Sequence, residues 1–263
     1  MRLYHNSLSS CSQKVRMVLH EKNLAYEDKL IDLQKGEQFS SEYISLNPNA
    51  VVPTLEDNGI VFIESTLINE YLDDAYPQIP LKPEAAADKH KMRLLCKKID
   101  DALHPACGII TYAIGARPSL LTRPKEEVDA LIEQIPSAAR RSIRRSVVDN
   151  GVRAPEFRDA MLTHRSMFDQ ANELLADNDW LMGPAFTLAD CALMPYVLRA
   201  CHLGQNAEVD SRPNLKRWFD AIQQRPAFNE AVTKWTPAPL IAAFNKAGQT
   251  VAADIDEVMS KLP

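Results

Sequence analysis

The chain has 263 residues, of which 46% are apolar and 25% charged, and its formal net charge is −5. This length suits one large domain or two smaller ones, and the composition is that of an ordinary globular protein. Without a basic excess, nucleic-acid binding is not expected. We expect no membrane contact either, because no run approaches the roughly 18 apolar residues of a membrane span and no signal peptide precedes the first polar residues.

The cysteines are five in number, an odd count in a long chain, which does not indicate a secreted disulfide framework. We therefore expect a cytoplasmic protein with reduced cysteines, and we predict no metal site. Most of the cysteines are expected to be small buried apolar residues. Cys11 is the exception, because it lies in a polar cluster at a predicted helix start.

The first 76 residues predict a small mixed sheet with helices on its faces. The first two strands are joined through a helix, so we expect them to be parallel. Asn58-Gly59 is a strong two-residue hairpin signal, which makes the strands on either side of it antiparallel. The predicted order is β-α-β-α-β-β-α, with strands at 1–5, 25–31, 52–56 and 60–63 and helices at 12–22 and 64–76, and with a short helix or turn at 36–46.

The composition changes after Pro77. Residues 78–85 are punctuated by prolines and are predicted to form a linker. Beyond it no strand is predicted, so we expect an α/β domain at 1–77 and an all-helical domain at 86–263. Helices are predicted at 86–112, 124–134, 137–149, 156–177, 187–203, 212–224, 227–235 and in the tail 239–261. The start of one of them, Thr187-Leu-Ala-Asp190, is typical of a capping box.

The string SSCSQKVR, residues 9–16, places hydroxyls and a thiol where the first strand ends and the first helix begins. A helix N-terminus offers unpaired N–H donors and a partial positive charge, which stabilise an anion such as a thiolate. Lowering a thiol pKa by about two units takes roughly 2.7 kcal/mol, and one charge-assisted hydrogen bond contributes about 1.5 to 3 kcal/mol. The anion is then either Cys11 or a thiol brought by a ligand. The alternative is that Ser9, Ser10 and Ser12 only cap the helix.

Two further features favour a ligand site at the sheet. Val52-Pro53 stands just before a predicted strand, and a cis proline there would leave the backbone N–H and C=O of Val52 facing outward. Those groups could pair with a peptide-like ligand as a short extra strand does. Glu64-Ser65 opens the next helix, whose N–H groups suit a carboxylate. We expect sheet, proline and helix ends to converge on one cleft.

The predicted helix 137–149, SAARRSIRRSVVD, is locally basic and contains Arg140, Arg141, Arg144 and Arg145. The simpler interpretation is a solvated helix face. The alternative is a basic entrance to a binding site, which attracts anions.

Together these features resemble the glutathione transferases, which combine a thioredoxin-like N-terminal domain with an all-helical C-terminal domain. The resemblance covers essentially the whole chain. SSCSQKVR, QFSSEYISLNPNAVVPTL and ESTLINEYLDDAYP look like the zeta-related, serine-type branch, and TLADCALMP resembles a buried helix start in the family's second domain. The resemblance implies glutathione as co-substrate and a homodimer.

The resemblance also assigns roles to single residues. Ser9 matches the hydroxyl that donates to the glutathione thiolate. Val52, next to a cis Pro53, would pair its backbone with the cysteinyl part of glutathione.

The two ends of glutathione have matching residues as well. Glu64 and Ser65 would hold the γ-glutamyl end, and Gln38 would reach the glycyl carboxylate. The simpler interpretations are a plain helix-start acid for Glu64 and a surface side chain for Gln38. In the family, an acidic residue on the long helix of a partner subunit often joins the γ-glutamyl ammonium, and Asp100 and Asp101 are both candidates.

Between about residues 113 and 156 the chain carries extra sequence relative to a typical zeta isomerase. This insertion looks like that of the glutathione-dependent β-aryl etherases of lignin breakdown, and it also resembles the reductive dehalogenase of chlorinated hydroquinones (tetrachlorohydroquinone). In the etherase type, the glutathione thiolate attacks the carbon beside a ketone, a phenolate leaves and a thioether forms. In the dehalogenase type, a cysteine two residues after the serine resolves a mixed disulfide, and Cys11 stands at that spacing from Ser9.

The resemblance therefore implies attack by the glutathione thiolate on an aromatic electrophile, most specifically β-aryl ether cleavage. Alternatives are a reductive dehalogenase or thiol-exchange enzyme, a zeta-like isomerase, and a non-catalytic binding protein of the same fold. His104 could protonate a leaving phenolate, or it is a structural residue. The candidate walls of the electrophile pocket are His104, Cys107, Ile110, Tyr112 and Ile114.

Overall fold

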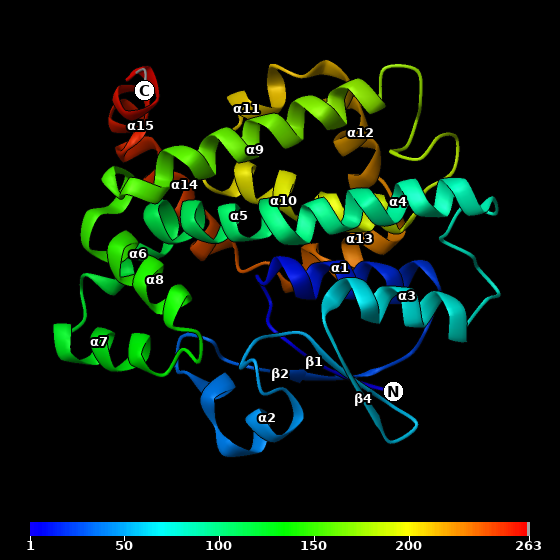
Figure 1. Cartoon of the computed structure of the whole chain (residues 1–263), viewed down its shortest axis with the longest axis horizontal. Helices are drawn as coiled ribbons and strands as arrows, with labels where there is room; N and C mark the ends of the chain where they lie inside the picture. Colours follow the sequence, from blue (N-terminus) through cyan, green and yellow to red (C-terminus); the bar gives the residue numbers. More distant parts are fainter. Residues whose placement is uncertain (262–263) are drawn as a thin grey trace. The chain divides into compact units, whose positions relative to one another are not determined.

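The computed structural model describes residues 1–261 (Figure 1). The chain forms two compact units. The first comprises Met1–Ile99, Ala171–Pro195 and Pro213–Thr236, and the second comprises Asp100–Gln170, Tyr196–Arg212 and the chain from Pro237 onward. Within residues 1–261, no helix is both long and apolar enough to cross a membrane.

The first unit contains one sheet. Its strands are β1 (Arg2–His5), β2 (Glu27–Leu30), β3 (Thr54–Asp57) and β4 (Ile60–Ile63), in the order β2-β1-β3-β4. β1 runs parallel to β2, and β3 runs antiparallel to β1 and β4, which confirms the predicted mixed sheet. Asn58 and Gly59 turn the chain between β3 and β4 with φ of 50° and 78°, in the left-handed region that a two-residue hairpin requires.

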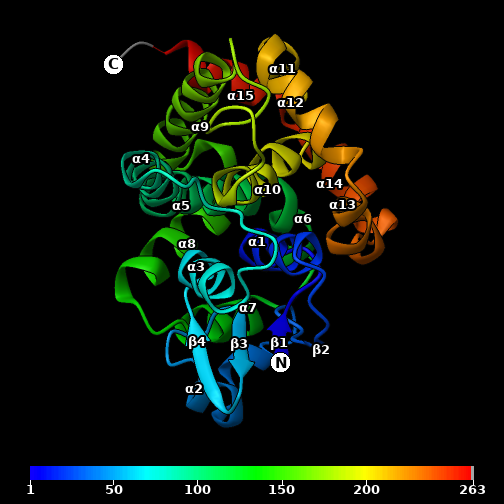
Figure 2. The ribbon, with the colours of Figure 1, turned by 90° about the vertical axis from the view of Figure 1, so that its right-hand side faces the viewer.

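Helices cover both faces of this sheet. α1 (Ser10–Glu21) and α3 (Ser65–Ala75) lie together on one face, and α2 (Ser41–Leu46) lies on the other side of the strands (Figure 2). A short 3-10 turn, η1 (Glu37–Phe39), precedes α2. α1 forms and packs this way because apolar side chains recur on one face and become wholly buried there. The predicted order β-α-β-α-β-β-α is confirmed.

Beyond β4 the regular structure is helical, and the only strand-like pairing within residues 64–261 is an isolated bridge between Trp180 and Gly183. This confirms the predicted all-helical part. The α-helices are α4 (Ala86–Lys98), α5 (His104–Thr111), α6 (Arg117–Leu120), α7 (Lys125–Glu133), α8 (Ala138–Asn150), α9 (Pro155–Leu174), α10 (Leu188–His202), α11 (Ala207–Asp210), α12 (Pro213–Gln223), α13 (Pro226–Ala231), α14 (Ala238–Thr250) and α15 (Ala252–Ser260).

The predicted helix 86–112 is longer and less regular than expected. It continues to Leu120 and contains two π-helical segments, η2 (Ile99–Leu103) and η3 (Tyr112–Ala116). Each segment ends two residues before a proline, Pro105 or Pro118. Proline has no N–H to donate to the carbonyl four residues earlier, so the regular α-helical hydrogen bonding is interrupted at both places.

The start of α10 depends on a buried carboxylate. Asp190 accepts hydrogen bonds from the backbone N–H of Thr187 at 2.8 Å and from its hydroxyl at 3.0 Å. It also accepts from the backbone N–H of Leu181 at 3.0 Å and from the indole N–H of Trp218 at 2.8 Å. Burial raises the pKa of Asp190, and these donors act against that rise. One half of the predicted capping box is therefore present: Asp190 reaches back to the N–H of Thr187, whereas the Thr187 hydroxyl donates to Asp190 and does not accept from its N–H. The same carboxylate ties α12 to this helix start through Trp218.

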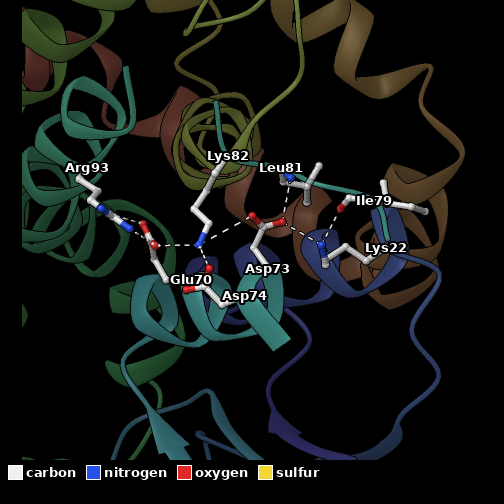
Figure 3. A network of polar contacts seen from close by, with 8 residues as sticks. All are labelled: Lys22, Glu70, Asp73, Asp74, Ile79, Leu81, Lys82 and Arg93. Atoms are coloured by element: carbon white, nitrogen blue, oxygen red, sulfur yellow. Dashed lines mark hydrogen bonds and ion pairs between the residues drawn. The ribbon is translucent and has the colours of Figure 1, made fainter. Parts of the chain in front are cut away.

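A buried ion pair ties the chain after α3 back to α1 (Figure 3). The ammonium of Lys22 donates to Asp73 Oδ1 at 2.8 Å and to the carbonyl of Ile79 at 2.5 Å. The backbone N–H of Leu81 donates to the same carboxylate oxygen at 2.8 Å. The side chains of Lys22 and Asp73 are only 1% and 3% exposed, so each charge depends on the other for compensation.

The network continues outward along α3 (Figure 3). Lys82 donates to Asp74 at 2.5 Å and to Glu70 at 3.3 Å. Arg93 donates to both carboxylate oxygens of Glu70, at 3.0 and 2.9 Å. The linker is thus held by charges at both of its ends.

Replacing Lys22 tests the inner ion pair. We expect Lys22→Met to lower the free energy of unfolding by about 3 kcal/mol, because the buried Asp73 carboxylate loses its nearest cation. Urea unfolding measures the difference. Lys91→Met is the control, since it breaks an exposed pair with Asp88 and is expected to cost less than about 0.5 kcal/mol. Equal decreases in the free energy of unfolding for the two variants would contradict a stabilising role of the buried Lys22–Asp73 pair.

Candidate functional site

Strand pairing brings three chain segments to one end of the sheet. Tyr4 of β1 is paired with Thr54 of β3, and Thr54 is paired with Ile63 of β4. The chain leaves β1 toward Ser9, enters β3 from Val52-Pro53 and leaves β4 toward Glu64-Ser65. The three predicted ligand-binding segments therefore adjoin the same row of the sheet. Topology alone accounts for their convergence.

Ser9 is the N-cap of α1. Its hydroxyl oxygen accepts from the backbone N–H of Ser12 at 3.2 Å, with φ of −61° and ψ of 122° at the cap. Accepting this bond leaves the hydroxyl hydrogen available to donate. Ser12 in turn accepts from the backbone N–H of Asn6 at 3.2 Å, which ties the turn to the helix. Cys11 is the second residue of α1 and is half-buried.

A wholly buried arginine, which the sequence did not single out, holds the turn between β1 and α1. Arg16 donates to the carbonyls of Asn6 at 3.0 Å and Ser7 at 2.9 Å, the two residues after β1. It donates also to the carbonyl of Ala231 at 2.6 Å, and its Nη1 lies 2.9 Å from Nδ1 of His5. Burial, followed by the charge of Arg16, lowers the pKa of His5 to about 3, so the imidazole is neutral.

The segment before β3 is fixed by side chains from α2 and its end. The Val52–Pro53 peptide bond is cis, as the resemblance implied. The carbonyl of Val51 accepts from the hydroxyl of Tyr43 at 2.7 Å and from the amide of Asn47 at 2.9 Å. These contacts fix the chain immediately ahead of Val52. Val52 stands two residues before Thr54, the first paired residue of β3.

Glu64 and Ser65 form the start of α3. Glu64 has a φ of +69°, which is unusual for a residue with a side chain and is typical of functional turns. Its exposed carboxylate accepts from the amide of Asn49 at 3.3 Å, and its carbonyl accepts from Ile68 N–H at 2.8 Å. Ser65 is the first residue of the helix and is buried.

Gln38 lies in η1, in the segment that follows β2. Its side chain is buried at 9% exposure, so it is not the surface side chain of the simpler interpretation. Its Oε1 has no hydrogen-bond partner within the described residues. A buried amide oxygen without a partner is costly, which is typical of a group that a ligand satisfies.

The predicted electrophile residues all belong to the second unit. His104 is exposed and its Nδ1 lies 3.2 Å from the hydroxyl of Tyr196. Cys107 is buried, with its sulfur 3.8 Å from Thr111 Oγ1, and borders an interior cavity of about 10 Å³. Tyr112 is half-buried, and the guanidinium carbon of Arg144 lies 3.1 Å from the centre of its ring.

The two remaining wall candidates, Ile110 and Ile114, are 3% and 1% exposed and pack inside the second unit. Among the wall candidates, His104 and Tyr112 therefore offer polar groups at the surface of this unit.

Two family models match the chain. The model of the glutathione S-transferase N-terminal domain matches residues 8–75, and that of the C-terminal domain matches residues 110–226. Protein LigF of Sphingobium sp. strain SYK-6 is 27% identical over 252 residues, covering 94% of this chain and 98% of LigF. The crystal structure of beta-etherase LigF from that strain aligns with a TM-score of 0.80, covering 89% of this chain and 98% of that one.

Other relatives carry different names. A maleylacetoacetate isomerase of Dictyostelium discoideum is 28% identical over 239 residues, covering 89% of this chain and 94% of that protein. A stringent starvation protein A homologue of Histophilus somni is 26% identical over 242 residues, covering 92% of this chain and 94% of that protein.

Arg16 offers a test of how the β1–α1 turn supports the site. We expect Arg16→Met to weaken glutathione binding about tenfold, because the carbonyls of Asn6 and Ser7 lose the donors that hold the turn. Arg16→Lys keeps the charge but not the forked geometry, so its affinity should fall between those of wild type and Arg16→Met. Calorimetric titration of the folded variants with glutathione measures the effect.

The matched control for Arg16 is Arg217→Met, which also removes bonds to two backbone carbonyls, those of Leu175 and Asn178. Its glutathione affinity should match that of the wild type. If a folded Arg16→Met variant bound glutathione as tightly as the wild type, the site would not depend on the hydrogen bonds from Arg16 to the turn.

Proposed function

The chain belongs to the glutathione S-transferase family, and we propose that it cleaves β-aryl ethers by glutathione-dependent substitution at an aromatic substrate. When bound, glutathione supplies the thiolate nucleophile. The carbon–oxygen bond of the ether breaks, a carbon–sulfur bond forms and a phenolate leaves. The observation that carries the proposal is the hydroxyl of Ser9 at the N-terminus of α1, in a chain that aligns with beta-etherase LigF over nearly its whole length.

The residues at the sheet end suit glutathione. A thiolate near Ser9 would accept a hydrogen bond from its hydroxyl, since the cap uses a lone pair of that oxygen and leaves its hydrogen to donate. One such bond contributes about 1.5 to 3 kcal/mol, which matches the roughly 2.7 kcal/mol that a shift of two pKa units needs. The side-chain N–H groups of Gln38 and the backbone N–H groups at the helix start at Ser65 would donate to the carboxylates at the two ends of the tripeptide. The unpartnered amide oxygen of Gln38 would accept from an N–H of the ligand.

On the electrophile side, His104 is the proposed proton donor for the leaving phenolate. Its ring is exposed, and its Nδ1 lies 3.2 Å from the hydroxyl of Tyr196, a contact that orients the imidazole. Cys107 and Tyr112 are the further proposed wall residues. We propose that the active form is a homodimer.

Product analysis with a guaiacyl β-aryl ether ketone tests the proposed reaction. We expect one glutathione thioether and one free phenol per ether consumed, measured by mass spectrometry. Ser9→Ala should slow turnover about 100-fold, because the thiolate loses its preorganised donor. Ser9→Thr keeps both the hydroxyl and the cap and should retain most activity.

The outcomes of that experiment separate the alternatives. An intact ether, together with glutathione conjugation of a simple aryl halide, would reject ether cleavage and leave a general transferase. No turnover with any electrophile, although glutathione binds, would favour the non-catalytic binding protein.

Cys11 supports a second candidate function, reductive thiol exchange. It is half-buried two residues after Ser9, and its position in the first turn of α1 favours a thiolate. If the enzyme is an etherase, Cys11→Ala should keep ether cleavage within about twofold of wild type, since the proposed step forms no disulfide. Rates of thioether release and of glutathione disulfide formation measure this. Loss of turnover in Cys11→Ala, with accumulation of a mixed glutathione adduct, would instead identify the reductive enzyme.

A further inference from the structure

The four arginines of α8 are not equivalent. Arg145 forms ion pairs with Asp129 and, at 3.3 Å, with Glu133. Arg141 lies 3.8 Å from Glu133 and donates to the carbonyl of Ile135 at 2.6 Å. Both acids belong to α7, which packs against α8 through an apolar cluster of Val128, Ile132 and Val148. Half of the basic helix is therefore neutralised by its neighbour.

Arg140 and Arg144 are different. They are four residues apart, so they lie on one face of α8. Within residues 1–261, neither forms an ion pair with a carboxylate. Burial and then the charge of Arg144 lower the pKa of Arg140, as expected for two cations that repel each other. Arg140 is exposed and Arg144 half-buried, so an anion from solvent can reach both guanidinium groups.

The partner of this face is an aromatic ring. The guanidinium of Arg144 stacks on Tyr112, with 3.1 Å between its carbon and the ring centre. Tyr112 begins η3, and α8 packs against η3 and α5 (Figure 1). Stacking occupies one face of the guanidinium plane and leaves the N–H groups at its edge to donate. Arg140, Arg144 and Tyr112 thus place cationic donors beside an aromatic surface.

We propose that Arg140, Arg144 and Tyr112 form a subsite for an aromatic substrate that carries an anionic oxygen group, a carboxylate or a phenolate. The ring of the substrate would pack beside Tyr112, and its anionic group would accept hydrogen bonds from the guanidinium edges. As a description of substrate choice, the proposal rests on the proposed glutathione-dependent function. The subsite itself requires no glutathione.

The charge count favours a small anion over a polyanion. Only two of the four arginines on α8 are without a carboxylate partner, and the whole chain has a net charge of −5. Nucleic-acid and membrane surfaces are bound through many more unneutralised cations, because affinity grows with the number of phosphates contacted. A single carboxylate or phenolate matches two guanidinium groups.

Matched electrophiles test the subsite. The charged probe is 4-chloro-3-nitrobenzoate, and the neutral probe is its methyl ester, which offers the same reacting carbon to glutathione. We expect the double variant Arg140→Gln/Arg144→Gln to lower kcat/KM about tenfold for the carboxylate and less than twofold for the ester. The control is Arg141→Gln/Arg145→Gln, which removes the same net charge from the same helix and should not change the ratio of the two rates.

Binding without chemistry separates this inference from the proposed function. Calorimetric titration with inert 4-nitrobenzoate and 4-nitrophenolate, without glutathione, should show weaker binding to the Arg140→Gln/Arg144→Gln variant, and the wild-type affinity should fall with added salt. The anion that binds more tightly identifies whether the subsite prefers a carboxylate or a phenolate. Equal affinity of wild type and variant for both anions would overturn the subsite. Retained anion binding, with no glutathione turnover of either electrophile, would overturn the proposed function and leave the subsite standing.

Discussion

The β1–α1 turn depends on one buried cation, and the predicted thiolate site depends on that turn. Arg16 is wholly buried, and its hydrogen-bond partners are three backbone carbonyls and the neutral ring of His5. Carbonyl dipoles solvate a guanidinium without cancelling its charge. Burial lowers the pKa of Arg16 to about 10, so it stays charged at neutral pH. Its positive field therefore adds to that of the helix end behind Ser9, and both favour an anion there.

Capping and thiolate binding are compatible uses of the same hydroxyl. The sequence presented them as alternatives for Ser9, because a serine at a helix start fits either. In the structure the oxygen of Ser9 accepts a hydrogen bond from the backbone N–H of Ser12. A hydroxyl that accepts through a lone pair can still donate its hydrogen to another group. The cap fixes the position of the oxygen, which preorganises the donor. The capping role of Ser9 is thus compatible with the proposed chemical role and is not evidence against it.

The sequence was sufficient where local chemistry determines the backbone. Asn58-Gly59 predicted the hairpin because only residues that accept positive φ fit such a turn, and Thr187-Leu-Ala-Asp190 predicted a helix start. It was insufficient where distant residues meet. Nothing in the spacing of Arg16 indicates that it reaches Ala231, 215 residues further along the chain. The positive φ of Glu64 and the burial of Gln38 likewise depend on how the sheet end is assembled.

The same limit explains why the basic helix was ambiguous. Four arginines in SAARRSIRRSVVD look alike in a sequence, and a solvated face was the simpler interpretation. The acids that divide them into two pairs lie on α7, and the ring that Arg144 stacks on lies 32 residues earlier, at Tyr112. A solvated face would need no aromatic partner and would gain from pairing all four charges with the acids nearby. Arg144 is set against Tyr112, and Arg140 lies beside it on the same helix face, neither with a carboxylate partner. Solubility does not explain this arrangement, and the proposed anion subsite does.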